Sequence, residues 1–218
     1  MKPIPKQITT YLDVPGFNNS KHLDALMEFA SNVPKGSRVL EIGCAWGCST
    51  WALLDSLPDG VYLHTCDTFG MNHPALKQKH FEGVMAKHHH NSAVSYAMHT
   101  YIEENLNAHR KVFDWVIGQH PRRGRVKHTV HQKPSTQVLE KDVEWSMVYI
   151  DGLHSYENVS TELNYLKDVS LLCGDDYHPA HPGTVKAIDE FLQKDQRVFE
   201  HHDFDTGSGF WTATKQES

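Results

Sequence analysis

Cysteine is scarce in this sequence, and what there is does not form a recognisable metal or disulfide pattern. Of the 218 residues only four are cysteines, at positions 44, 48, 66 and 173. A zinc pair at Cys44 and Cys48 is conceivable, but no second cysteine pair completes a four-ligand site. The cysteines fall mainly where predicted strands end or turn into helices, and such positions suit buried free thiols. We therefore expect a reducing, cytoplasmic compartment.

Long apolar runs and an excess of basic residues are also missing. The longest apolar stretches are a handful of residues, so we expect no membrane span, and the start MKPIPKQITT does not resemble a signal peptide. The formal net charge of −6 argues against a nucleic-acid partner that is bound by broad electrostatics. The length suits one domain over residues 1–218, with an apolar content of 39% to build its core.

Helical and extended patterns alternate along the first part of the chain. A helix is expected from Ser20, which we take as its N-cap, because Leu23 and Leu26 fall on one face. Residues 1–36 then form an N-terminal arm and helix. The pattern continues with a strand over 38–43, a helix over 49–56 and a strand over 61–67. Residues 68–120 have few turn signals, and we interpret them as one or two helices and an irregular lid.

The alternation resumes after the lid. Strands are expected over 125–132, 146–151 and 170–176, with a short helix over 136–140, a helix over 156–167 and another after Gly183. Strands over 197–203 and 210–215 are typical of a hairpin. This order predicts an α/β fold: a seven-stranded sheet, mostly parallel with a C-terminal antiparallel hairpin, and helices on both faces.

Polar residues stand at the ends of several predicted strands. Ligands of open parallel sheets bind at the carboxyl ends of the strands, so these positions are candidates for a site. The first is the loop Glu41-Ile-Gly43-Cys-Ala-Trp-Gly47, whose glycines allow close approach of a ligand and a sharp turn into the next helix. Its spacing differs from the dinucleotide and phosphate-binding glycine loops. Asp67 ends the next strand.

This loop resembles the E/D-x-G-x-x-x-G motif of class I methyltransferases, which have a Rossmann-like sheet and use S-adenosyl-L-methionine. The resemblance implies that the loop surrounds the methionine end of the cofactor and that Asp67 binds the ribose hydroxyls. The cofactor-binding residues it implies are Glu41, Gly43, Ala45, Gly47, Ser49, Asp67, Ser135 and Asp151. Three departures stand beside it. Ala45 replaces a glycine, Lys133-Pro134-Ser135 stands where relatives often have an acid near adenine, and Lys167-Asp168-Val169-Ser170 replaces the Pro-Gly-Gly that many relatives have before the fifth strand.

A second motif, Asp151-Gly-Leu-His154-Ser-Tyr156, is followed by Asp175-Asp176. It is similar to the DG-x-H-x-Y…DD pattern of sugar and macrolide O-methyltransferases and to the layout of metal-dependent catechol-type enzymes. By that resemblance Asp151, Asp175 and Asp176 bind a divalent metal, most simply Mg²⁺. His154 is the candidate catalytic base, because a neutral imidazole can accept the proton of a hydroxyl whose pKa the metal lowers. The implied reaction is O-methylation of a small polar acceptor, such as a sugar or diol.

Other interpretations remain open. The same acids suit a metal-dependent hydrolase on an α/β scaffold, although a hydrolase has no need of the glycine loop with Asp67. A non-catalytic protein that binds S-adenosylmethionine is the third possibility.

Several single residues also have alternative roles. Asp175 and Asp176 suit a helix cap or turn as well as a metal site, and His154 suits a hydrogen-bonded loop. His178 and His181 are candidates for the substrate pocket or the metal shell, whereas Arg122, Arg123 and Arg125 suit either an anion site or a solvated loop. The sequence names neither the acceptor nor the oligomeric state, and a homo-oligomer is compatible with it.

Overall fold

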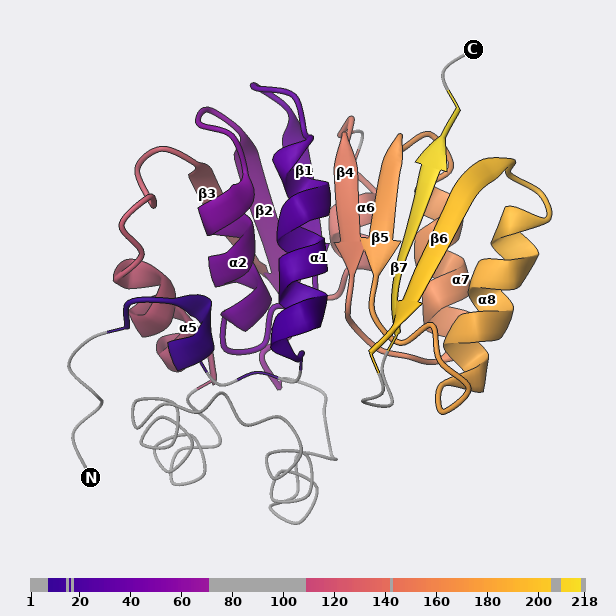
Figure 1. The fold of residues 1–218 in the computed structure, drawn as a ribbon, viewed down its shortest axis with the longest axis horizontal. Coiled ribbons are helices and arrows are strands. Elements are labelled where there is room, and N and C mark those ends of the chain that lie inside the picture. Colours follow the sequence, from indigo (N-terminus) through magenta and orange to yellow (C-terminus); the bar gives the residue numbers. More distant parts are fainter. Residues whose placement is uncertain are drawn as a thin grey trace.

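A single twisted sheet organises the protein. The computed structural model describes residues 8–14, 16, 18–70, 109–141, 143–204 and 209–216. These residues form seven strands in the order β3-β2-β1-β4-β5-β7-β6 (Figure 1). The strands are β1 Arg38–Ile42, β2 Tyr62–Asp67, β3 Lys127–Gln132, β4 Met147–Ile150, β5 Leu171–Gly174, β6 Arg197–Asp203 and β7 Gly209–Lys215. β1 to β5 are parallel and β7 is antiparallel to both of its neighbours, which confirms the predicted fold class.

Helices cover both faces of this sheet. The helices are α1 Ser20–Ser31, α2 Cys48–Ser56, α5 His109–Gly118, α6 Thr136–Leu139, α7 Tyr156–Tyr165 and α8 Pro182–Leu192, with a short 3-10 turn, η1 Tyr11–Asp13. Side chains alternate along each strand, so that Val39 joins the core beneath α1, α2 and α5 while Leu40 joins the core beneath α6, α7 and α8. Among the described residues no helix is long and apolar enough to cross a membrane.

Helix boundaries differ slightly from the sequence prediction. The N-cap of α1 is Asn19 rather than Ser20, because the Asn19 side chain accepts a hydrogen bond from the backbone amide of His22 (2.9 Å). Asparagine and serine are about equally good caps, so the sequence alone did not distinguish them.

Residues 109–118, part of the segment interpreted as one or two helices and a lid, form a helix that belongs to the core. Helix α5 places Val112, Phe113 and Val116 in the cluster beneath α1 and α2, where each is buried. Residues 71–108, the rest of that segment, lie outside the described residues.

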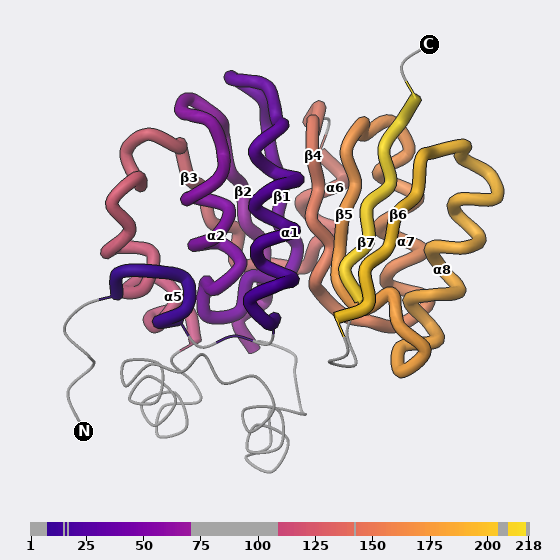
Figure 2. The backbone as a smooth tube through the Cα atoms, viewed as in Figure 1, coloured from indigo at the N-terminus to yellow at the C-terminus, as the bar shows by residue number. Residues whose placement is uncertain are grey.

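The order of the strands reverses between β1 and β4. The chain builds β1, β2 and β3 outward in one direction and then returns to add β4 on the other side of β1, as the colour change at the middle of the sheet shows (Figure 2). The carboxyl ends of the parallel strands lie at the lower edge in Figure 1. Open parallel sheets bind ligands at such a switch point, so this carboxyl edge is where a site is expected.

Candidate functional site

The glycine loop between β1 and α2 contacts the end of β4 very closely. Gly43 has φ +84°, and a Cβ atom on it would lie 2.0 Å from the carbonyl oxygen of Asp151. Gly47 has φ +97° and begins α2, where a Cβ would lie 3.1 Å from Ile117. Both positions therefore need glycine, one for contact with β4 and the other for packing against α5.

Asp67 holds this loop from the end of β2. Its Oδ2 accepts hydrogen bonds from the backbone amides of Cys44 (3.1 Å) and Ala45 (2.8 Å), and its Oδ1 accepts one from Phe69 (2.6 Å). The residue is half-buried, and each carboxylate oxygen has further lone pairs for a ligand hydroxyl.

Glu41 lies beneath the loop and is completely buried. Its two carboxylate oxygens accept hydrogen bonds from the hydroxyls of Ser49 and Thr50, at 2.6 Å each, in the first turn of α2. Burial raises the pKa of Glu41 to about 7, although these hydroxyls act in the opposite direction. Glu41 and Ser49, both predicted to bind the cofactor, thus contact each other and fix how β1 leads into α2.

Asp151, His154 and Asp176 form the group most suited to a metal ion. Among the residues that the structure describes, this is the group of at least three histidine, cysteine, aspartate or glutamate side chains whose ligand atoms converge, all within 4.8 Å of one another. His154 Nδ1 lies 2.7 Å from Asp176 Oδ2, and His181 Nε2 lies 3.1 Å from Asp176 Oδ1. Two carboxylates and an imidazole suit Mg²⁺ or Mn²⁺, and the imidazole widens the choice toward transition metals.

The charges of this group are strongly coupled. Burial disfavours the charged form of His154, but the hydrogen bond to Asp176 and the neighbouring carboxylates outweigh it and raise the pKa of His154 to about 9. Burial also opposes the charge on Asp176, yet His154 and His181 hold the pKa of that carboxyl below its usual value. Without a cation, His154 is therefore an imidazolium at neutral pH, not the neutral base that its ordinary pKa would suggest.

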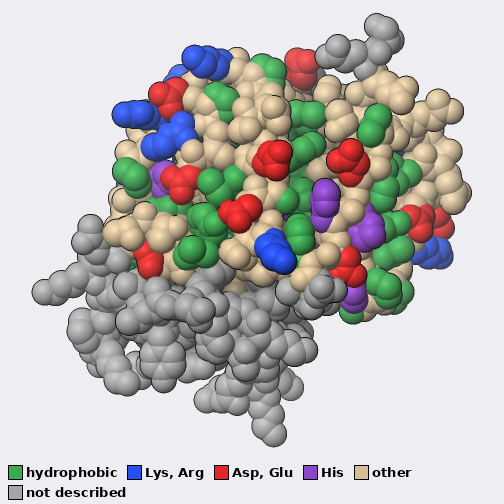
Figure 3. Space-filling model, in the orientation of Figure 1, with side chains coloured by type: hydrophobic (Ala, Val, Ile, Leu, Met, Phe, Trp, Pro, Cys, Tyr) green, Lys and Arg blue, Asp and Glu red, His purple; other side chains and the backbone are tan. Residues whose placement is uncertain are grey.

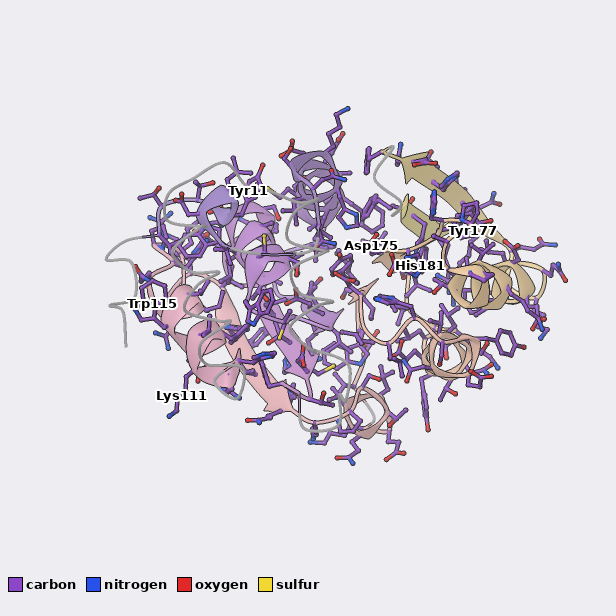
Figure 4. All side chains as sticks on the ribbon, turned by 90° about the horizontal axis from the view of Figure 1, so that it is seen from below. Tyr11, Lys111, Trp115, Asp175, Tyr177 and His181 are labelled. Carbon is purple, nitrogen blue, oxygen red and sulfur yellow. The ribbon has the colours of Figure 1, made fainter. Side chains whose placement is uncertain are left out.

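Asp175 is not one of these three converging side chains, although its Oδ2 and Asp151 Oδ2 both lie near the Asn18 amide, and the metal role implied by the resemblance stays a prediction. Asp176 has φ +64°, in the left-handed region, so the two neighbouring carboxylates diverge. Asp175 Oδ2 accepts a hydrogen bond from Asn18 Nδ2 (2.9 Å), and its Oδ1 lies 3.5 Å from His22 Nδ1. Seen along the carboxyl edge, Asp175 lies near the middle, with His181 beside it in the direction of Tyr177 (Figure 4).

Asn18 and His22 extend a buried polar network to Asp151. Tyr149 donates a hydrogen bond to Asp151 Oδ2 (2.9 Å), and His22 Nε2 lies 3.0 Å from the Tyr149 hydroxyl. Asn18 Nδ2 also lies 3.3 Å from Asp151 Oδ2. Burial lowers the pKa of His22 and raises the pKa of Asp151 well above its usual value. The N-terminal residues thus help to hold the carboxylates of β4 and β5.

Sequence reasoning missed Asn18, His22 and Glu162, which are all buried. A signal existed for two of them. His22 falls on the same helix face as Leu26, and Glu162 falls between Val159 and Leu163 on the apolar face of α7. A polar side chain on a buried helix face needs a partner, so such positions are informative.

Other sequence candidates have structural partners. Arg122 donates to the backbone carbonyls of Leu54 and Leu57 and to Asp59, so it fixes the end of α2. Cys44 and Cys48 are buried, and neither forms a disulfide among the described residues. Histidines gather on the face over β6 and β7, where His201 and His202 are exposed (Figure 3). The run His88-His89-His90 lies outside the described residues.

Comparisons with known proteins match the fold and the motif region. A sequence model of the family described as "methyltransferase domain" matches residues 40–177. An O-methyltransferase from Bacillus cereus in complex with S-adenosylhomocysteine is 15% identical and has a TM-score of 0.57, over 93% of this chain and 85% of that one. A Corynebacterium glutamicum protein is 12% identical with a TM-score of 0.59, over 98% and 93% of the two chains.

A third similar structure is an rRNA methylase from Streptococcus thermophilus, 12% identical with a TM-score of 0.50, over 93% of this chain and 100% of that one. No curated protein sequence matches the chain. At such low identity these likenesses establish the fold, whereas the match over residues 40–177 spans the glycine loop and both acid motifs.

Proposed function

Since the chain belongs to the methyltransferase-domain family, we propose that it uses S-adenosylmethionine to methylate a hydroxyl group on a small polar acceptor, such as a sugar or a diol. The observation that carries this proposal is that Asp151 contacts both the glycine loop and the group suited to a metal. Its backbone carbonyl meets Gly43 of the glycine loop, and its carboxylate belongs to the group with His154 and Asp176. A cofactor held at the loop is thereby adjacent to residues that can activate an acceptor.

The loop residues fit such a cofactor. S-adenosylmethionine supplies a methyl group on a positively charged sulfur. Gly43 and Gly47 leave the loop backbone open to close approach, and the half-buried carboxylate of Asp67 is available to ribose hydroxyls. Because Glu41 is enclosed by Ser49 and Thr50, its part in this proposal is to position the loop rather than to contact the cofactor.

Asp151 and Asp176 would hold a divalent metal, with the His154 ring beside it. Such an ion lowers the pKa of a hydroxyl that it binds. Asp175 is the less favoured ligand of the predicted set, because its oxygens already contact Asn18, His22 and the Asp176 amide. Mg²⁺ suits the carboxylates alone, and Mn²⁺ suits them together with an imidazole.

His154 is proposed as the group that takes the proton of the acceptor hydroxyl. Asp176 orients the ring through Nδ1, which leaves Nε2 for the acceptor. The pKa of His154 is about 9 in the absence of a cation, and a divalent ion on the neighbouring carboxylates would lower it, because the positive charge of the ion opposes that of the imidazolium. The neutral ring that a base requires is therefore the form expected when the metal is bound.

Calorimetric titration of metal-stripped protein with S-adenosylmethionine, with and without Mg²⁺ or Mn²⁺, tests the proposal. We expect cofactor binding that Asp67→Ala abolishes and a separate metal event that Asp176→Ala abolishes. Asp175→Asn should retain metal binding if the carboxylates of Asp151 and Asp176 hold the metal. Metal binding without any cofactor binding would favour the hydrolase interpretation instead.

A second variant tests the proton acceptor. With an acceptor found by screening, His154→Ala should lower turnover by at least about 100-fold, a usual loss for a general base, while cofactor affinity stays unchanged. His202→Ala, which removes an exposed histidine on β6, is the control. Equal turnover in the His154 variant and the control would contradict this role.

A further inference from the structure

A buried carboxylate on α7 has one oxygen without a partner. Glu162 is only 1% exposed, and its Oε1 accepts hydrogen bonds from Ser135 Oγ (2.5 Å) and Asn158 Nδ2 (2.8 Å). Among the described residues, no donor lies within hydrogen-bonding distance of its Oε2. A buried acceptor without a partner is destabilising. An enclosed carboxylate held on one side and free on the other suggests that a ligand provides the missing donor.

This carboxylate lies at the carboxyl edge of the sheet. Its Oε1 is 3.9 Å from the position that a Cβ on Gly152 would take, directly after β4. Ser135, its hydrogen-bond donor, follows the end of β3. Glu162 also contributes to the raised pKa of Cys66, the residue before Asp67. Glu162 is therefore next to the strand ends where the proposed cofactor binds, on the β3 side of Asp67.

The sequence after β3 lacks an acid of its own. The segment Lys133-Pro134-Ser135 offers a cation, a proline and a hydroxyl, and the Ser135 hydroxyl is directed to Glu162. The negative charge available at this point of the edge thus comes from α7, about one helical turn beyond Asn158.

We propose that Glu162 recognises the exocyclic amine of the cofactor's adenine, with Ser135 and Asn158 holding the carboxylate in place; this inference rests on the proposed use of S-adenosylmethionine. The ring nitrogens of adenine that face outward are acceptors, and the ribose hydroxyls are assigned to Asp67. The amine is then the part of the nucleoside that can donate to a carboxylate here. Burial raises the pKa of Glu162, while the Ser135 and Asn158 donors lower it, and an amine donor acts in the same direction as these two.

Inosine analogues test this assignment, because a carbonyl oxygen, which accepts and is repelled by a carboxylate, replaces the amine, and the one donor gained, N1–H, lies at the neighbouring ring position. We expect wild-type protein to bind S-adenosylhomocysteine about 10- to 100-fold more tightly than S-inosylhomocysteine, the usual effect of losing a hydrogen bond to a buried charge. Glu162→Gln keeps the shape but offers a donor to that carbonyl, so the ratio of the two dissociation constants should fall to near one or reverse. Glu157→Gln, an exposed position on the same helix, should keep the wild-type ratio.

The outcomes separate this inference from the proposed function. Equal binding of both compounds by wild-type protein, or an unchanged ratio in Glu162→Gln, would overturn the assignment of Glu162 and leave the methyltransferase proposal standing. Binding of neither compound would overturn both. If Glu162→Gln does not fold, Ser135→Ala carries the test, because loss of the anchor should reduce the selectivity several-fold without removing the carboxylate.

Discussion

Single residues with left-handed backbone determine where the groups of the carboxyl edge point. Gly43 lets the loop after β1 meet the end of β4, and Asp176 turns its side chain away from that of Asp175. The consequence is that Asp176 faces His154 and His181, whereas Asp175 faces the interior network around His22. The sequence motif treated the two aspartates as equivalent, because a motif specifies residue types and spacing but not backbone dihedral angles.

Gly43→Ala should destabilise the protein severely. The substitution adds a methyl group to a left-handed residue, at about 1–2 kcal/mol, and also forces an overlap with the Asp151 carbonyl, so we expect a total loss of about 4 kcal/mol or more. Gly36→Ala is the matched control, since Gly36 has φ +82° but no atom within 4 Å of the added carbon. Urea denaturation of both variants measures the difference. Equal losses would show that the contact with β4 relaxes freely.

The His154–Asp176 contact should make the stability of the metal-free protein depend on pH. The pKa of His154 is raised in the folded state to about 9 from an ordinary 6.5, so its contribution is fully present below about pH 6.5 and is lost as the pH rises through 9. Because the side chain is 38% exposed, solvent screening limits the effect to about 1 kcal/mol. Denaturation curves across this range should show the loss in wild-type protein and not in His154→Gln. A parallel pH profile in the variant would assign the change to other groups.

At the scale of whole elements, α1 does more than cover the sheet. Its buried His22 contacts Tyr149 and lies near Asp175, and the ring packs edge-on against Phe210 with 5.0 Å between centroids. The helix therefore connects the N-terminal part of the chain with the ends of β4 and β5. Loss of the His22 contacts should lower the stability of the protein and also change how the Asp151 and Asp175 carboxylates are held.

His22→Ala should lower the free energy of unfolding by about 3 kcal/mol, because it leaves a cavity and removes a partner from the Tyr149 hydroxyl. Lys21→Ala, at the neighbouring exposed position, should change it by less than about 0.5 kcal/mol. Thermal or urea unfolding gives both values. A small effect of the His22 substitution would mean that water or a neighbouring side chain replaces the imidazole.

Periodicity predicted most elements within a residue or two, since a strand that ends in glycine or an acid and a helix with one apolar face leave clear patterns. The caps were less certain, as Asn19 shows. Partners within the site were not predictable from spacing, because they depend on rotamers and packing across elements. The sequence motif thus predicted that His154 and the aspartates lie at one edge of the sheet. It could not predict that Ser49 and Thr50 enclose Glu41 or that Asp175 turns away from Asp176, because these depend on contacts between elements.

For the molecule as a whole, the alternation of elements was sufficient to predict the seven-stranded sheet, since parallel strands with crossover helices permit few topologies. The same reasoning predicts a ligand site at the carboxyl edge near the strand switch, and this stays a prediction. An acceptor cannot be predicted in this way, because a single fold serves many substrates.

The pairing of β1 with β4 has a consequence for folding. Val39 lies beside Met147, so the centre of the sheet joins segments that are remote along the chain, and β2 and β3 stand between them in sequence. Contacts between remote segments form slowly, because the intervening chain must be ordered first. We therefore expect the candidate site at the β1–β4 junction to be complete only in molecules in which these two strands have paired. A ligand that binds there would bind only fully folded chains. It would therefore lower the rate of unfolding and leave the rate of folding almost unchanged.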